Sequence, residues 1–197
     1  LARIKKNSGR YTLENAGINS DKSDYGSAFF NNKVVFASAR DTGGLAGRKH
    51  SWTNESFTNL YAADMGSEGT LSSEERFGSK LNSKFHESTP VFKKDRKTVY
   101  FTRNNFLDGK KGKDEAGTIL LKIYKATNEN GKWSNVTELP FNSDAYSVAH
   151  PALSADEKFL YFSSNMPGTK GASDLFKVEI KADGSFGTPI NLGDDIN

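Results

Sequence analysis

The feature that most constrains the fold is a repeat of about 60 residues that runs through the whole chain. Its first marker is a phenylalanine within a short apolar run, whose copies, 65 and 61 residues apart, are Phe36, Phe101 and Phe162. Its second marker is an asparagine after an apolar residue, whose copies, 63, 60 and 55 residues apart, are Asn19, Asn82, Asn142 and Asn197. Two independent markers that drift together indicate a true internal repeat.

Each repeat unit contains about four short apolar runs, separated by clusters of Gly, Asp and Asn. The clearest copy is residues 150–176, HPALSADEKFLYFSSNMPGTKGASDLF. Such spacing is typical of antiparallel strands joined by turns, and one four-stranded sheet per repeat is the plan of a β-propeller. We therefore predict an all-β fold, a partial β-propeller with about three complete four-stranded blades plus the end of a preceding blade.

The two markers divide the chain into four parts. Residues 1–20 are expected to end a preceding blade, and the three complete blades are expected at 21–82, 83–142 and 143–197. In the first of these blades, the fourth strand is predicted at 76–81. Because propellers have about four to eight blades, we expect all four parts to belong to one propeller domain of a longer protein.

Composition narrows the function classes. The chain has 27 basic and 24 acidic residues, and its net charge of +3 is too balanced for a dedicated nucleic-acid binder. The absence of cysteine excludes disulfides, thiolate catalysis and zinc sites built from cysteine. The chain contains no run of 18 apolar residues, so no segment is predicted to span a membrane.

The titratable residues form no recognisable catalytic or metal-binding pattern. His86, followed by Glu87, and His150 are expected near the central channel, where a histidine beside a carboxylate can do acid–base work or bind a metal. Carboxylates that could supply oxygen ligands there are Asp21, Asp24 and Asp144. These residues share no spacing, and no calcium loop, nucleophile elbow, Walker loop or zinc motif is present. We therefore predict no catalytic residue, no metal site and no cofactor.

Propeller geometry predicts where binding residues lie. Strands run antiparallel from the axis outward, so the loop between the second and third strands lies on the same face as the connection to the next blade. The long loops expected on this face are 40–57, 103–116 and 164–173, whereas the opposite face is expected to carry tight turns. Because long loops on a rigid scaffold commonly carry binding sites, this face is predicted to bind a partner protein. The alternative is that the loops are solvated insertions.

Two of these loops mix basic and aromatic residues, a composition common in protein interfaces. The candidate partner-binding residues are Arg48, His50, Trp52, Phe57, Phe106, Lys110 and Lys111. Another interpretation is that Trp52 and Phe57 fold back to anchor their own loop, and that the basic residues form only a solvated surface.

The last third of the chain carries a series of closely spaced motif positions. They are Pro151, Ser154, Asp156, Tyr161, Phe162, Ser163, Ser164, Asn165, Gly168, Gly171, Asp174, Phe176, Pro189, Asn191, Leu192, Gly193 and Asn197. This pattern resembles the WD40-like repeat related to TolB propellers, in the version found in OmpA-type outer-membrane proteins of Bacteroidetes. Glu157 departs from the usual Gly of that repeat and Phe176 from its Tyr; in the middle copy, Lys93 replaces Ser and Leu121 replaces Asp.

The resemblance implies a function as well as a fold. It implies a non-enzymatic interaction or scaffold module, in the periplasm or associated with the outer membrane, that binds protein partners of the cell envelope in secretion or gliding machinery. It further implies a link to peptidoglycan through another domain. The alternative left open is a glycan- or peptide-processing propeller, either an enzyme or an enzyme-gating domain. Fold alone does not separate these functions, and the missing catalytic motifs favour the scaffold.

Overall fold

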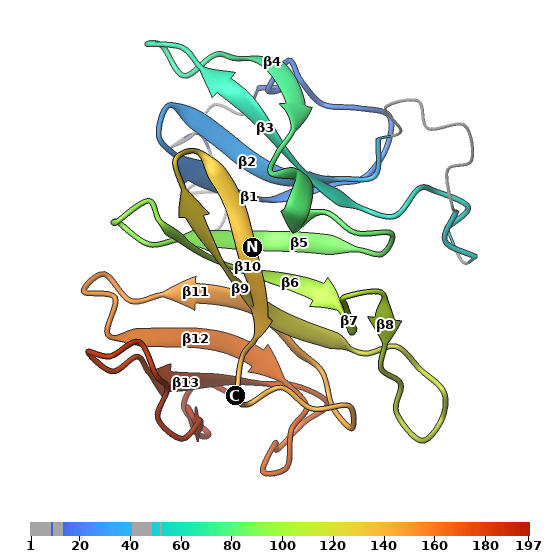
Figure 1. Cartoon of the computed structure of the whole chain (residues 1–197), viewed down its shortest axis with the longest axis vertical. Helices are drawn as coiled ribbons and strands as arrows, with labels where there is room; N and C mark the ends of the chain where they lie inside the picture. Colours follow the sequence, from blue (N-terminus) through green and yellow to red (C-terminus); the bar gives the residue numbers. More distant parts are fainter. Residues whose placement is uncertain (1–8, 10–13, 41–48, 52) are drawn as a thin grey trace.

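The computed structural model describes residues 9, 14–40, 49–51 and 53–197, which form strands, turns and one short 3-10 helix. Twelve strands make three four-stranded sheets, in which neighbouring strands pair antiparallel in chain order (Figure 1). The two other strands form a small hairpin. The predicted all-β class and the predicted four-stranded antiparallel sheets are confirmed.

The strands fall into three groups along the chain. The first sheet contains β1 (Asp24–Phe30), β2 (Lys33–Ser38), β3 (Asn59–Met65) and β4 (Leu71–Arg76), and is followed by the 3-10 helix η1 (Ser79–Leu81). The second contains β5 (Glu87–Phe92), β6 (Thr98–Asn104), β9 (Leu121–Glu129) and β10 (Lys132–Glu138). Between β6 and β9 lies the hairpin of β7 (Phe106–Leu107) and β8 (Lys110–Lys111). The third contains β11 (Val148–Leu153), β12 (Phe159–Ser164), β13 (Asp174–Glu179) and β14 (Ile190–Asn191).

The first strands of the three sheets converge. Each has a β-bulge at the same place, with a residue in the left-handed conformation: Gly26 (φ 65°), Thr89 (φ 45°) and His150 (φ 58°). A Cβ atom on Gly26 would lie 3.0 Å from Cγ2 of Thr89, so β1 and β5 approach closely there. Oγ1 of Thr102 lies 2.9 Å from Oγ1 of Thr89 and accepts a 2.9 Å hydrogen bond from the amide of His150. The three sheets therefore share a common inner edge.

The repeated phenylalanines occupy matching positions in their sheets, each beside an aromatic ring of the third strand. Phe101 is buried with Tyr124 in the core between the first and second sheets, with ring centroids 6.1 Å apart. Phe162 is buried with Phe176 between the second and third sheets, with centroids 5.8 Å apart. Phe36 pairs with the tyrosine of β3 in a smaller cluster on the outer side of the first sheet. Large aromatic rings thus give thin sheets enough buried area.

A side-chain amide closes each sheet, which explains the second sequence marker. Asn82 accepts a 2.7 Å hydrogen bond from the amide of Leu60 and donates to its carbonyl at 3.4 Å. Asn142 makes the same two bonds to Ile123, at 3.1 and 2.7 Å. Asn197 makes them to the equivalent residue of β13, at 2.7 and 3.1 Å. These three residues, which we call the amide clamps, satisfy the third-strand amide at the end of the fourth strand, and they share its carbonyl with the backbone amide that follows that strand.

The large hydrophobic side chains that stay exposed lie on the two end sheets. Among the described residues they are 45% to 72% exposed and are Tyr25, Phe29, Leu175, Ile190 and Ile196. The residues that match Leu175 in the other sheets, Leu60 and Ile123, are 0% exposed because the next sheet covers them. The outer sides of the first and third sheets therefore have the character of sheet-packing surfaces.

The fourth strand of the first sheet corrects the prediction. It spans Leu71–Arg76 rather than 76–81, because the chain turns back at once, with the amide of Gly66 donating to the carbonyl of Thr70 at 2.9 Å. Residues 79–81 form η1 instead. Leu71 is the only apolar residue of this exposed edge strand, so the sequence carried no apolar run to mark it.

Candidate functional site

The described parts of the long loops of the first two sheets, residues 49–51, 53–57 and 103–116, lie on one side of the molecule (Figure 1). The amide of Glu87 donates to the carbonyl of Thr58 at 2.9 Å, and Oγ1 of Thr58 donates to the carbonyl of Glu87 at 3.0 Å. These bonds join the loop before β3 to the connection before β5. The amide of Asn104 donates to the carbonyl of His86 at 3.2 Å, which ties the end of β6 to the same connection.

Rings from these segments pack into one group, which we call the ring cluster. Its members are His50, Phe57, Phe85, His86 and Phe106. The ring of Phe57 lies 4.6 Å from that of His86 and 5.7 Å from that of Phe85, and Phe85 lies 5.1 Å from Phe106. Phe85 is buried and the other four rings are partly exposed. Phe85 therefore anchors the cluster in the protein interior, and the other four rings are accessible to solvent.

His86 is held in one orientation. Its Nδ1 accepts a 3.1 Å hydrogen bond from the amide of Thr58, so the hydrogen of the neutral ring lies on Nε2. The ring of His50 is 5.2 Å away. Burial, with a smaller contribution from His50, lowers the pKa of His86. At neutral pH the ring cluster therefore presents His86 as an uncharged group.

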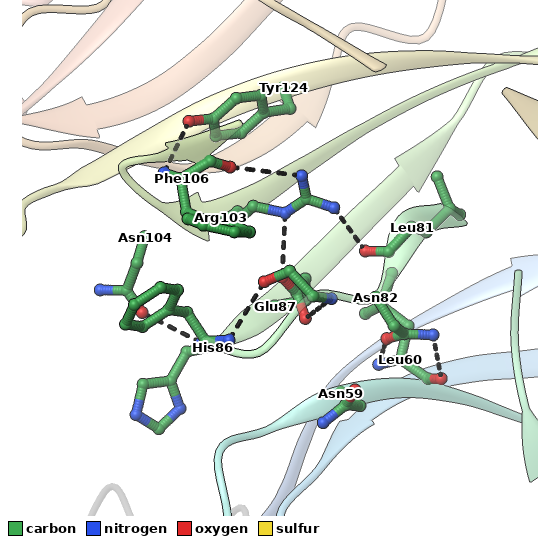
Figure 2. Close-up of polar contacts among 12 residues, drawn as sticks. Asn59, Leu60, Leu81, Asn82, His86, Glu87, Arg103, Asn104, Phe106 and Tyr124 are labelled. Carbon is green, nitrogen blue, oxygen red and sulfur yellow. Dashed lines mark hydrogen bonds and ion pairs between the residues drawn. The ribbon is translucent and has the colours of Figure 1, made fainter. Parts of the chain in front are cut away.

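A buried ion pair lies beside the ring cluster (Figure 2). Nε of Arg103 donates to Oε1 of Glu87 at 2.9 Å, and the two side chains are 4% and 0% exposed. Ser83 adds two hydrogen bonds to this carboxylate, 3.0 Å from its amide and 2.5 Å from its hydroxyl. Burial raises the pKa of Glu87 to about 7, although the charge of Arg103 and the bonds from Ser83 act in the opposite direction.

The guanidinium of Arg103 also organises its surroundings. It lies 5.1 Å from the ring centroid of Phe101 and 5.2 Å from that of Tyr124. Its Nη2 donates to the carbonyl of Leu81 at 2.9 Å (Figure 2). The hydroxyl of Tyr124 accepts a 3.2 Å bond from the amide of Phe106, which fixes the backbone of this member of the ring cluster. One buried cation thus supports the backbone on both sides of the site.

In the other two sheets, different side chains cap the carbonyl that is equivalent to that of Leu81. In the first sheet, Arg40 stacks on its own pair of rings and Nη2 donates to the carbonyl of Ile18 at 2.8 Å. In the third sheet, the hydroxyl of Tyr146 donates to the carbonyl of Phe141 at 3.2 Å. Ile18, like Leu81 and Phe141, directly precedes a marker asparagine. Each sheet therefore caps the carbonyl that comes before this asparagine. The first two sheets use an ion-paired arginine, Arg40 with Asp24 at 3.0 Å and Arg103 with Glu87 at 2.9 Å, and the second pair is the more deeply buried.

A hollow of about 440 Å³ opens next to the ring cluster. Phe106, Ser83 and Arg103 contribute to its lining. Nearby, Asn59 is 7% exposed, donates to the carbonyl of Phe57 at 2.9 Å, and leaves Oδ1 without a partner among the described residues. The side chains here offer rings, donors and a buried acceptor, which suits binding. Within the described residues, no three His, Asp or Glu side chains group together to hold a metal ion.

The predicted site residues have different outcomes. Arg48 and Trp52 lie outside the described residues. His50, Phe57 and Phe106 come together in the ring cluster. Lys110 and Lys111 form the exposed strand β8, in which Lys111 pairs with Phe106. Their role in binding a partner stays a prediction. In the described part of the chain, no helix is long and apolar enough to cross a membrane.

Sequence reasoning missed part of the site and misplaced another part. Phe85 was not foreseen. The matching residues of the other two connections, Lys22 and Ala145, are not aromatic, so an aromatic residue at this position of the repeat could have indicated the site. His86 belongs to the ring cluster rather than to a channel site. Glu87 is unavailable for acid–base work because it is fully buried against its arginine.

No family model and no curated protein matches the chain. Among solved structures, it is similar to a puromycin-hydrolyzing peptidase of Mycobacterium tuberculosis, with 12% identity over 88% of this chain and a TM-score of 0.46. It is also similar to a puromycin hydrolase, with 16% identity over 90% of this chain and a TM-score of 0.45. The chain spans 24% and 33% of the length of these two structures. With TM-scores below 0.5, these likenesses do not bear on activity.

Proposed function

We propose that this chain is a non-enzymatic interaction module of a bacterial cell-envelope protein, and that the ring cluster binds a partner protein. The observation that carries the proposal is the convergence of His50, Phe57 and Phe106, from two loops far apart in sequence, with Phe85 below them. Partly exposed rings next to Lys84, whose Nζ lies 5.0 Å from the ring of Phe106, have the composition of an interface centre.

The scaffold that presents this site is proposed to be a β-propeller of the WD40-like, TolB-related type. The common inner edge and the matching ring pairs support this architecture, and the exposed apolar residues of the end sheets support further sheets beyond them. Radical footprinting of the protein as produced in its host tests the closure. Leu175 and Ile196 should be protected from modification, and strong modification of both would contradict a closed propeller.

The resemblance to OmpA-type proteins supports a location in the periplasm or at the outer membrane. The proposed partner is accordingly an envelope protein, in secretion or gliding machinery, with a link to peptidoglycan supplied by another domain. This assignment rests on the motif positions of the last third of the chain. Fractionation of a Bacteroidetes host that found the protein in the cytosol would contradict it.

The binding role is tested by photo-crosslinking in an envelope extract of such a host. Phe57→Ala and Phe106→Ala should reduce the yield of a defined crosslinked product at least about tenfold, since truncating an interface anchor costs 2 kcal/mol or more. Lys181→Ala, on an exposed turn of the third sheet, is the matched control and should leave the yield unchanged. Equal yields from all three variants would refute the proposal. Circular dichroism spectra confirm that each variant is folded.

A further inference from the structure

A second surface lies between the first and second sheets, away from the ring cluster. It is a groove of about 1190 Å³, bordered by the β1–β2 turn, the end of β4, the β5–β6 turn and the β9–β10 hairpin. In Figure 1 the tip of the β9–β10 hairpin extends toward the first sheet. Nothing in the proposed function uses this groove, which we call the inter-sheet groove.

The inter-sheet groove has an aromatic floor. Phe30, Phe77 and Trp133 line it, with ring centroids 5.5 to 6.0 Å apart. Gly78, with φ 60°, allows the indole of Trp133 to pack directly on the backbone, because a Cβ there would lie 3.0 Å from Cδ1 of the indole. The indole N–H of Trp133 donates no hydrogen bond within the described residues. The floor therefore offers apolar contact and one free donor.

The rim of the inter-sheet groove is positively charged. It contains six basic and three acidic residues, so its net charge of +3 equals that of the whole chain. Lys33 is neutralised by Asp64 and Glu75, at 2.8 and 3.1 Å. The basic residues that form no ion pair within the described part of the chain are Arg76, Lys80, Arg96, Lys97 and Lys132. The unpaired positive charge is thus concentrated along the rim of the inter-sheet groove.

We propose that the inter-sheet groove binds an extended acidic peptide segment. Spaced carboxylates of the segment pair with Arg96, Lys97 and Lys132 on the rim, and one of its apolar side chains packs on the aromatic floor. A peptide fits better than a single-stranded nucleic acid because the floor rings pack against one another, which leaves no ring pair open for stacked bases.

Tryptophan fluorescence tests the proposal directly. The chain has two tryptophans, so Trp52→Phe leaves Trp133 as the only indole reporter. The probe is a synthetic peptide of about ten residues that alternates Glu and Asp with a central Phe and Leu. Binding should shift the emission of Trp133 and should weaken about tenfold or more between low salt and 0.5 M salt, because exposed charge pairs are screened.

Charge reversal then locates the site. The double variant Lys97→Glu with Lys132→Glu should weaken peptide binding about tenfold or more. The matched control, Lys158→Glu with Lys181→Glu, makes the same charge change on exposed residues of the third sheet and should bind as the parent does. Equal affinity of both double variants, tighter binding of a thymidine oligonucleotide, or equal binding of a basic peptide would each overturn the proposal. Phe57→Ala should leave peptide binding intact, which separates this proposal from the ring cluster.

Discussion

The second and third sheets occupy equivalent places in the repeat, yet they fill one cross-strand position in opposite ways. In the second sheet the paired residues are Glu87 and Arg103, which form a buried ion pair. In the third sheet the paired residues are Val148, which packs in the apolar core, and Ser164, whose hydroxyl donates to the carbonyl of Ser147 at 2.7 Å. The fold therefore does not require a charge at this position. The first sheet keeps an equivalent pair, between Asp24 and Arg40 at 3.0 Å, and the rings of the ring cluster come from loops of the first two sheets. The comparison teaches that the charged pair accompanies the sheets that carry the ring cluster and that apolar packing replaces it in the sheet that does not.

The largest expected effect comes from breaking the ion pair on one side only. Arg103→Met leaves the carboxylate of Glu87 buried and unpaired, and should lower the free energy of unfolding by about 3–5 kcal/mol. Adding Glu87→Val, which copies the third sheet, should recover most of that loss because no buried charge remains. Urea unfolding followed by circular dichroism measures both.

The control for this pair of variants is a more exposed ion pair. Lys93 lies 3.9 Å from Glu157, and Lys93→Met should cost less than about 1 kcal/mol. If the double variant Arg103→Met with Glu87→Val were as unstable as Arg103→Met alone, the second sheet would need the ion pair. The comparison with the third sheet would then fail.

The next effect is on the pH dependence of stability. Burial raises the pKa of Glu87 to about 7, above its unfolded value of 4.5, so the folded protein binds more protons between these values. The contribution of Glu87 to the free energy of unfolding is fully present below about pH 4.5 and is lost as the pH rises to about 7. The difference is on the order of 3 kcal/mol. In Glu87→Gln, the free energy of unfolding should lack this decline. Parallel pH profiles for variant and parent would exclude a raised pKa.

The amide clamps give a smaller and graded effect. Asn82→Ala should lower the free energy of unfolding by about 2 kcal/mol, because the buried amide of Leu60 loses its acceptor, whereas the carbonyl of Leu60 keeps the 2.9 Å bond from the amide of Phe77. Asn197→Ala should cost less than about 1 kcal/mol, since Leu175 is 45% exposed and water can replace the amide. Chemical denaturation compares the two variants, and equal losses would mean that the two clamps are equally shielded from water.

The smallest effect tests the cap of the third sheet. Tyr146→Phe removes the hydroxyl that donates to the carbonyl of Phe141, and should lower the free energy of unfolding by about 1 kcal/mol. Tyr25→Phe, at a 45% exposed residue, serves as the control and should change little. No difference between these variants in thermal unfolding would show that the tyrosine cap does not replace the arginine caps of the other sheets.

Much of the architecture could be predicted because its repeating parts are large and local. The phenylalanine positions recur as each sheet must bury rings against its neighbour, and the marker asparagines recur because a short amide is needed at each clamp. The β4 strand was misplaced since an edge strand in contact with water needs no apolar pattern.

The candidate site was less predictable than the scaffold. The aromatic and basic composition of two loops expected on one face pointed to His50, Phe57 and Phe106, and the rings of these residues lie in one cluster. The pairing of Glu87 with Arg103 could not be foreseen, because a bulge after Ser88 shifts the register of β5 against β6. One added residue reverses which side chains face the core, and no local pattern reveals where that residue is inserted.

The amide clamps also bear on how such a chain can change in length. An asparagine side chain holds the chain where it leaves each sheet. The length of the fourth strand can therefore vary, from seven residues in β10 to two in β14, without leaving third-strand backbone groups unsatisfied. Insertions and deletions can therefore accumulate at the periphery while the inner strands keep their register. Repeat units that differ by several residues along this chain are the expected outcome of that tolerance.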